Sequence, residues 1–218
     1  MSKLSNIIAF SALTGILAIA CGKDKPLTSE TNEVMTTKQG TVYEVDTMNS
    51  RIEWKGFKVI KSDNMSHFGT IRFESGEVTV KDGKLESGKF VADMNTVTSV
   101  DLKDDQEQND QLVDHLKSAD FFGVNKFPTS SFEITKVTPN TTGDYNTSID
   151  GNLTIKGITK PLTFNANVSL KEGEVSIATE PKDIDREDFG VKFQMPVTDG
   201  VIKNEMNIQI FIKGMERK

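Results

Sequence analysis

Hydrophobic and polar side chains alternate along most of the chain after residue 41. In residues 202–213, one face carries mostly isoleucine and methionine, and the other carries mostly lysine, glutamate, asparagine and glutamine. Residues 162–170 alternate in the same way. A period of two places successive side chains on opposite faces of a strand, so both segments predict β-strands that bury one face.

Earlier parts of the chain show shorter segments of the same kind. The further predicted strands are Val42–Asp46, Arg51–Val59, Ser66–Ser75, Glu77–Lys81, Lys84–Met94, Ser130–Val137 and Tyr145–Lys156. The dipeptides Asp82-Gly83, Lys156-Gly157 and Glu172-Gly173 suit tight hairpin turns that need a positive φ. Across Gly56 the apolar phase shifts, and a β-bulge at this glycine is the simplest interpretation.

One stretch, Asp101–Ser118, breaks the alternation. It is poor in β-formers, and its acidic residues come early while Lys117 comes late, the order that a helix dipole favours. Leu112, Val113 and Leu116 form a small apolar stripe. The stretch predicts one helix, packed over the sheet or across a barrel mouth.

Together these elements predict an all-β fold, a single extended antiparallel β-barrel of about eight strands with one inserted helix. Closure is expected because an open sheet of this size would leave two long edges exposed. A transmembrane barrel would need girdles of interfacial aromatic residues. The chain has one Trp and two Tyr but thirteen Phe, which favours apolar faces that line an interior.

The first twenty residues predict an export signal. The apolar run 7–20 follows Lys3 and is too short for a permanent membrane-spanning helix. Leu17-Ala18-Ile19-Ala20-Cys21 resembles the bacterial lipobox, in which the cysteine is acylated and becomes the first residue. An ordinary secretory signal with a coincidental cysteine is the alternative. The predicted organisation is a lipoprotein signal peptide over 1–20, a flexible tether over 21–40 after acylated Cys21, and the barrel over 41–214.

Composition narrows the function classes. The net charge of −6 without a clustered basic face argues against a nucleic-acid partner. Cys21 is the single cysteine, so no internal disulfide is expected. The sequence has no phosphate-binding loop, dinucleotide fingerprint or Ser-His-Asp arrangement. Neither His67 nor His115 has partners at catalytic or metal-ligand spacing. We therefore predict no catalytic residue, metal site or cofactor; a lipid-modifying enzyme using one of these histidines stays an alternative.

Several segments resemble one family. They are Tyr43–Asp46 with Asn49–Trp54, His67–Ile71, Asp114–Phe122 (DHLKSADFF) with Phe127-Pro128 and Ser131-Phe132, Gly151–Pro161 (GNLTIKGITKP), and Ile184–Gly190 (IDREDFG). Together they resemble the YceI-like family of polyisoprenoid-binding, lipocalin-like periplasmic proteins over about residues 43–213. The resemblance implies an extended barrel whose apolar lumen takes a long isoprenoid or other lipid chain. Asn49 stands where many members have histidine, which puts a head-group contact at that position in doubt.

Thirteen side chains on the apolar faces and the helix are candidate ligand contacts, although each can instead be packed core. They are Trp54, His67, Ile71, Phe73, Phe90, Leu112, Leu116, Phe121, Phe132, Leu153, Phe164, Ile208 and Ile210. Phe121 and Phe122 can gate the entrance or staple the helix to the barrel. Arg186 and Asp188 suit a turn-stabilising ion pair, and a head-group contact is the alternative for Arg186.

These observations predict an exported envelope lipoprotein, periplasmic or surface-exposed, that attaches to a membrane through Cys21. It would bind a polyisoprenoid or other long apolar ligand as a carrier or reservoir and perform no chemistry on it. A structural or interaction lipoprotein with a filled barrel is the alternative. The oligomeric state is left open, with a homodimer among the possibilities.

Overall fold

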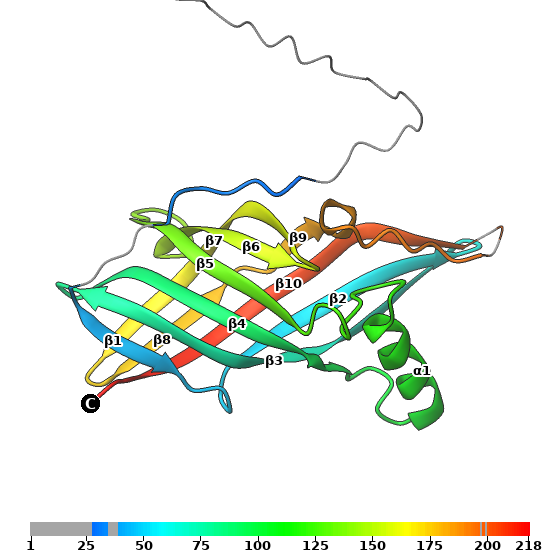
Figure 1. Cartoon of the computed structure of the whole chain (residues 1–218), viewed down its shortest axis with the longest axis horizontal. Coiled ribbons are helices and arrows are strands. Elements are labelled where there is room, and N and C mark those ends of the chain that lie inside the picture. The colour runs from blue at the N-terminus through cyan, green and yellow to red at the C-terminus, as the bar shows by residue number, and fades with distance from the viewer. Residues whose placement is uncertain (1–27, 35–38, 197, 199) are drawn as a thin grey trace, which may run out of the picture.

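The computed structural model describes residues 28–34, 39–196, 198 and 200–218, and strands dominate them (Figure 1). Apart from the helix α1, the elements are β1 (Thr41–Val45), β2 (Arg51–Ile60), β3 (Asp63–Lys81), β4 (Lys84–Ser99), β5 (Thr129–Pro139), β6 (Thr147–Ile155), β7 (Ile158–Lys171), β8 (Glu174–Thr179), β9 (Lys182–Asp185), the short 3-10 helix η1 (Arg186–Phe189) and β10 (Gly200–Glu216). Ser66–Ser75 and Glu77–Lys81, predicted as two strands, are one strand, β3. The short strands β8 and β9 were not predicted.

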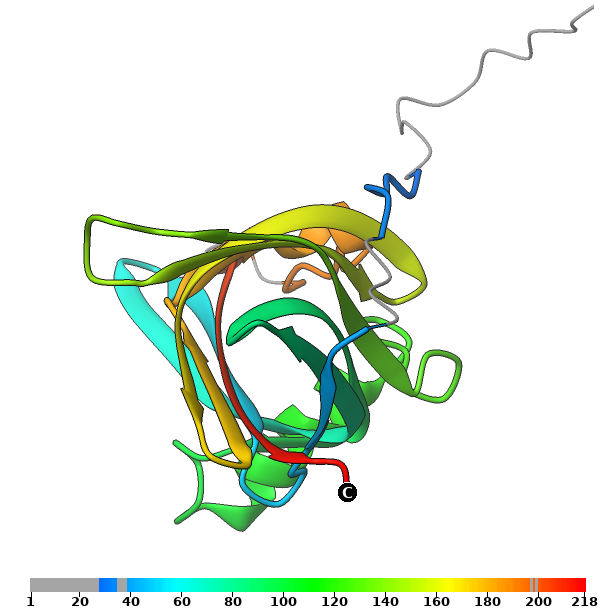
Figure 2. The same cartoon turned by 90° about the vertical axis from the view of Figure 1, so that its left-hand side faces the viewer.

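The strands form one closed antiparallel sheet. Its order runs β10-β2-β3-β4-β5-β6-β7-β8, and β8 pairs back onto β10. Figure 2 shows the resulting ring. At one end β1 takes the place of β2 between β10 and β3, and β9 pairs with β10 beyond the end of β8. Ten strands therefore fill eight positions around the ring, which confirms the predicted fold class.

Inward-facing apolar side chains form one continuous core along the ring. Ile134, Phe164 and Val175 are almost fully enclosed. The hairpin turns follow the predicted chemistry at two places, because Asp82-Gly83 and Lys156-Gly157 each have positive φ at both residues. These turns fix the register of the strands that they join.

The predicted bulge at Gly56 is wrong. β2 pairs with β3 in unbroken register through Gly56 and His67. The irregularity lies opposite, on β10, where Lys58 faces Ile202 but Gly56 faces Met206. The extra residues of the irregularity therefore belong to β10. β2 keeps its regular alternation, so Phe57 shares a face with Lys55, whose ammonium nitrogen lies 5.3 Å from the centre of the Phe57 ring.

The helix α1 (Gln106–Lys117) lies at one end of the ring, outside the sheet (Figure 1). Asp105 caps it, because its carboxylate accepts a hydrogen bond from the Gln108 backbone N–H at 3.1 Å. The helix begins later than predicted because Asp101 is engaged elsewhere, accepting a hydrogen bond from the Phe68 N–H at 2.9 Å. Leu116, in the last turn of the helix, is its buried residue.

The predicted signal peptide and Cys21 lie outside the described residues. Residues 28–34, within the predicted tether, run along the outside of the ring next to the β6–β7 hairpin (Figures 1 and 2). In the described part of the chain, no helix has the length and hydrophobicity needed to span a bilayer.

Candidate ligand-binding cavity

The ring encloses a cavity of about 230 Å³ in the half that lies next to α1. Side chains from β2, β3, β4, β5, β6 and β10 form its wall together with α1 and the loop after it. Twelve of the thirteen predicted contacts line it. They are Trp54, His67, Ile71, Phe73, Phe90, Leu112, Leu116, Phe121, Phe132, Leu153, Ile208 and Ile210.

Phe164 is the exception. It is 1 % exposed and lies at a separate void of about 20 Å³ further along the ring. Phe90, Phe132 and Ile210 line both spaces. These three side chains therefore form the inner end of the cavity, and Phe164 lies behind them.

Other wall residues were missed by the sequence reasoning. Two of them, Phe193 and Met195, come from the irregular segment 190–196, where no period of two reveals which side chains face inward. Ile202 and Met206 lie on the apolar face that alternation predicts for residues 202–213. The apolar wall residues outside the predicted set are Ile52, Phe57, Ala92, Met94, Val97, Ile155, Phe193, Met195, Ile202 and Met206. Ile52, Ala92 and Met94 share a strand face with predicted contacts, so alternation was the signal that could have found them.

The helix and the loop after it cover one side of the cavity. The ring of His115 packs edge-to-face on Phe193, with 4.4 Å between ring centres, and on Phe121 at 5.4 Å. Phe121 and Phe122 are buried, line the cavity and contact each other at 5.6 Å. These ring contacts attach the helix region to the cavity wall, as the staple interpretation predicts, and gating of the entrance by this pair stays a prediction.

Few polar side chains line the cavity, and two lining residues are held by polar groups at the end of β4 and just after it. The indole N–H of Trp54 donates to the Thr98 carbonyl at 3.1 Å. Nδ1 of His67 lies 2.7 Å from a carboxylate oxygen of Asp101. Burial opposes ionisation of Asp101, but hydrogen bonds from the Phe68 N–H, His67 and Ser99 outweigh it and lower the pKa of this carboxyl. A proton on Nδ1 suits this contact and leaves Nε2 of His67 for a ligand.

Arg186 is a buried cation in the wall. Its guanidinium donates to the carbonyls of Lys203 at 3.1 Å, Ile202 at 3.3 Å and Val191. The predicted ion pair with Asp188 is wrong, because the arginine turns to these carbonyls on β10 and the segment before it. Burial lowers the pKa of Arg186, while Glu187 and Asp185 oppose that shift. Its three bonds tie η1 to the cavity wall.

The cavity reaches the surface at the end formed by the β2–β3 hairpin and the start of β10. Exposed Lys203 and Glu205 belong to its wall there, beside half-buried Lys58 and Met195. The cavity is thus open at a partly charged end and bounded by aromatic rings at the other. Among the described residues, no three His, Cys, Asp or Glu side chains are grouped to hold a metal ion.

Comparison with known sequences gives consistent matches. Residues 43–213 match the model of the YceI-like domain. A UPF0312 protein of Pseudomonas putida is 30% identical over 155 residues, which cover 69% of this chain and 74% of the relative. A UPF0312 protein of Pseudomonas aeruginosa is 29% identical over 159 residues, with the same coverage.

Two solved structures share the fold. BcnA of Burkholderia cenocepacia superposes with a TM-score of 0.57 at 22% identity, covering 78% of this chain and 98% of BcnA. A polyisoprenoid binding domain from Saccharophagus degradans, implicated in plant cell wall breakdown, gives a TM-score of 0.53 at 11% identity, covering 81% of this chain and 99% of that domain. At these identities the likeness concerns the fold.

Proposed function

The chain belongs to the YceI-like domain family, and from this we propose that it binds one apolar, chain-like lipid in its cavity and serves as a carrier or reservoir. The observation that carries the proposal is the apolar cavity of about 230 Å³ inside the ring. A buried water molecule needs two to four polar partners, and an apolar cavity of about 150 Å³ can stay dry and take benzene. An apolar ligand larger than one aromatic ring therefore suits this space better than water.

Burial of hydrocarbon supplies the affinity. Each buried methylene contributes about 0.8 kcal/mol, so about ten of them gain about 8 kcal/mol before the cost of association. Such binding needs no specific polar contact along the chain. It selects for a flexible, unbranched or isoprenoid tail that can follow the wall from the opening to Phe132.

The polar groups near the opening suit the polar end of such a lipid. His67 offers a ring nitrogen, and Arg186 has five N–H groups of which three are used by carbonyls. A few polar groups in a largely apolar pocket typically orient a ligand. We therefore place the polar end at the opening and the tail toward Phe90 and Phe132.

The ligand class is also part of the proposal. The Saccharophagus degradans protein that shares this fold is a polyisoprenoid binding domain. The shared fold and the apolar cavity, open at one end, support a polyisoprenoid or another long-chain lipid as the ligand of this chain. We further propose that the protein is exported and lipid-anchored at Cys21 in the cell envelope, on the strength of its lipobox-like sequence.

A filled barrel with a structural role is the second candidate. The specific observation in its favour is the half of the ring beyond Phe132, where Ile134 and Phe164 leave only about 20 Å³. The cavity on the other side of Phe132 favours ligand binding. For the third possibility, an enzyme, the His67–Asp101 pair is the strongest feature, and replacing His67 and His115 together should leave the bound lipid chemically unchanged.

The test is to purify the mature protein from its own host and extract it under denaturing conditions for mass spectrometry. We expect one apolar molecule per chain. Ala92→Leu, which adds carbon atoms to the cavity wall, should lower this ratio, whereas Val137→Ile, outside the cavity, should not. Repeated preparations in which the folded protein carries no lipid and takes none up would refute the proposal.

A further inference from the structure

The segment before the barrel is attached to it at a defined place. The Glu30 N–H donates to the Thr159 carbonyl at 2.8 Å, and the Thr159 N–H donates to the Ser29 hydroxyl at 3.1 Å. Two further hydrogen bonds join Asn32 to Asn152, each at 2.9 Å. We call residues 28–34 the strap.

Asn152 makes the attachment specific. It lies on β6 and is 6 % exposed. Its side-chain amide donates to the backbone carbonyl of Asn32 and accepts from the backbone N–H of the same residue. A buried amide needs such partners, and here the strap supplies both a donor and an acceptor. The ion pair between Lys160 and Glu30, at 3.2 Å, is exposed and adds little.

The direction of the strap shows toward which end of the barrel its first residues lie. Asn32 lies beside Asn152, whereas Glu30 lies beside Thr159, which is two residues from the Lys156-Gly157 turn. The first residues of the strap therefore lie on the side of this turn. The ammonium group of Lys156 donates to the Phe121 carbonyl at 2.6 Å, so the turn touches the cavity wall. The strap therefore begins in the half of the barrel that contains the cavity.

Exposed apolar side chains gather around the cavity opening. Among the described residues, six large hydrophobic side chains are exposed, and four of them are Met65, Phe68, Val100 and Val201. We call these four the rim. Two of them lie at the opening in the sheet: Met65 pairs with Lys58, which lines the cavity, and Val201 pairs with Val59, the next residue of β2.

The other two rim members lie side by side. Phe68 follows the cavity residue His67 in β3, and its carbonyl accepts a hydrogen bond from the Val100 N–H at 2.9 Å. Isolated exposed hydrophobic residues are ordinary, but a group of them at the entrance to an apolar cavity indicates an interaction surface.

We propose that the strap and the rim together hold the cavity opening against the bilayer in which the anchor sits, so that the partner of the rim is the lipid surface. This inference rests on the proposed function and on acylation of Cys21. From Cys21 to residue 28 the chain spans at most about 25 Å, whereas a free tether to residue 40 would span up to about 70 Å. Docking the strap therefore keeps the cavity half of the barrel near the membrane.

The rim side chains would contact the bilayer directly. Phe, Val and Met side chains can enter the boundary between head groups and acyl chains without any charge complementarity. A lipid tail could then pass from the bilayer into the cavity without crossing water. The unfavourable exposure of its methylenes, about 0.8 kcal/mol each, is thereby avoided.

The single cysteine makes a direct experiment possible. The mature chain, starting at Cys21, is coupled through its thiol to maleimide lipids in vesicles of phosphatidylethanolamine and phosphatidylglycerol that contain parinaric acid. Trp54, the only tryptophan, lines the cavity and reports arrival of the polyene chain by energy transfer. The same probe offered from detergent micelles measures cavity binding without the membrane.

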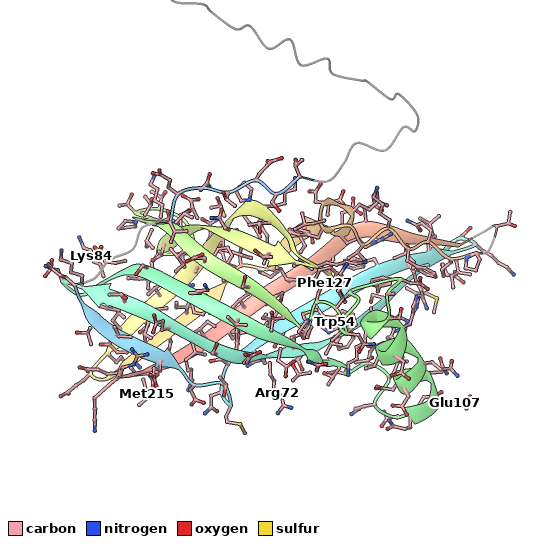
Figure 3. The ribbon with its side chains drawn as sticks, viewed as in Figure 1. Trp54, Arg72, Lys84, Glu107, Phe127 and Met215 are labelled. Carbon is pink, nitrogen blue, oxygen red and sulfur yellow. The ribbon has the colours of Figure 1, made fainter. Side chains whose placement is uncertain are left out.

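We expect Phe68→Ser combined with Val201→Ser to slow transfer from vesicles about tenfold and to leave binding from micelles unchanged. Replacing residues 28–34 with glycine and serine should slow transfer likewise, without altering a residue of the barrel. Met215→Ser is the matched control, because Met215 is exposed to a similar degree but lies at the opposite end from α1 (Figure 3).

Two results distinguish an error in this inference from an error in the proposed function. If the rim variant binds the probe from micelles but takes it from vesicles as fast as the unaltered protein, the rim does not face the bilayer and this inference is wrong. If the unaltered protein binds no probe from micelles, the proposed lipid-binding function itself is wrong, and the inference falls with it.

Discussion

The ring of Phe132 meets the ring of Phe164 edge-to-face, with 5.5 Å between their centres, so Phe164 supports from behind one of the side chains that close the inner end of the cavity. Gly151 on the neighbouring strand makes room for it, because a Cβ there would lie 2.2 Å from Cζ of Phe132. We therefore expect Phe132, held between a glycine and a second ring, to limit the length of tail that the cavity can accept.

Phe132→Ala should join the cavity to the smaller void behind it. Removing a buried phenylalanine costs about 3–5 kcal/mol of folding stability, which denaturant unfolding would measure. In exchange, the variant should carry a longer chain than the unaltered protein, as determined by mass spectrometry of the extracted lipid.

Phe164→Ala is the control for this prediction, because it is also a large buried loss but enlarges only the void behind Phe132. It should lower stability by a similar amount and leave the length of the bound chain unchanged. Equal chain lengths in both variants would show that Phe132 does not limit the ligand.

Arg186 should be far less tolerant of lysine than an exposed arginine is. Its planar guanidinium reaches three carbonyls in different directions, which a single ammonium group cannot reproduce. We expect Arg186→Lys to lower the free energy of unfolding by about 2–3 kcal/mol. Arg51→Lys, in an exposed pair with Glu53, should lower it by less than about 1 kcal/mol. Urea unfolding of both variants, followed by circular dichroism, provides the comparison; equal losses would contradict a structural role for the three carbonyl contacts.

The sequence predicted which strand faces are apolar but not where along the ring each side chain lies. Phe132 and Phe164 both face inward, and alternation treats them alike. Their depth depends on strand register, with Phe132 opposite Leu153 and Phe164 opposite Ile149. This is why Phe164 was predicted as a cavity residue although it lies behind the cavity.

The same limit explains the misplaced bulge. The apolar phase of β2 changes at Gly56, but only the pairing shows that β10 carries the extra residues. The irregular segment 190–196 has no alternation of apolar and polar side chains, so the sequence did not identify Phe193 and Met195 as wall residues. The strap is polar, and its contact with Asn152 depends on a buried amide that nothing in the local sequence distinguishes from an exposed one.

Asp101 should make stability depend on pH in the acid range. Its folded-state pKa is below the ordinary value of 3.8, so its contribution is fully present above that value and is lost as the pH falls through the lowered one. Asp101→Asn keeps an acceptor but loses the charge beside His67. We expect it to be about 2 kcal/mol less stable at neutral pH, with a gap that narrows below about pH 4. Urea unfolding across this range would show it, and a gap that stays constant into acid would contradict it.

Cys21→Ser should release the protein from the membrane without unfolding it. Cys21 lies outside the barrel residues and offers the only thiol for acylation, and stable attachment to a bilayer requires more than one acyl chain. Expressed in its host, the variant should move from the membrane fraction to the soluble fraction, and its thermal unfolding midpoint should equal that of the unaltered barrel. Lipid extraction from the soluble variant should still yield the bound molecule, because the cavity wall is unchanged. A variant that stays in the membrane fraction after its signal has been removed would show that Cys21 is not the anchor.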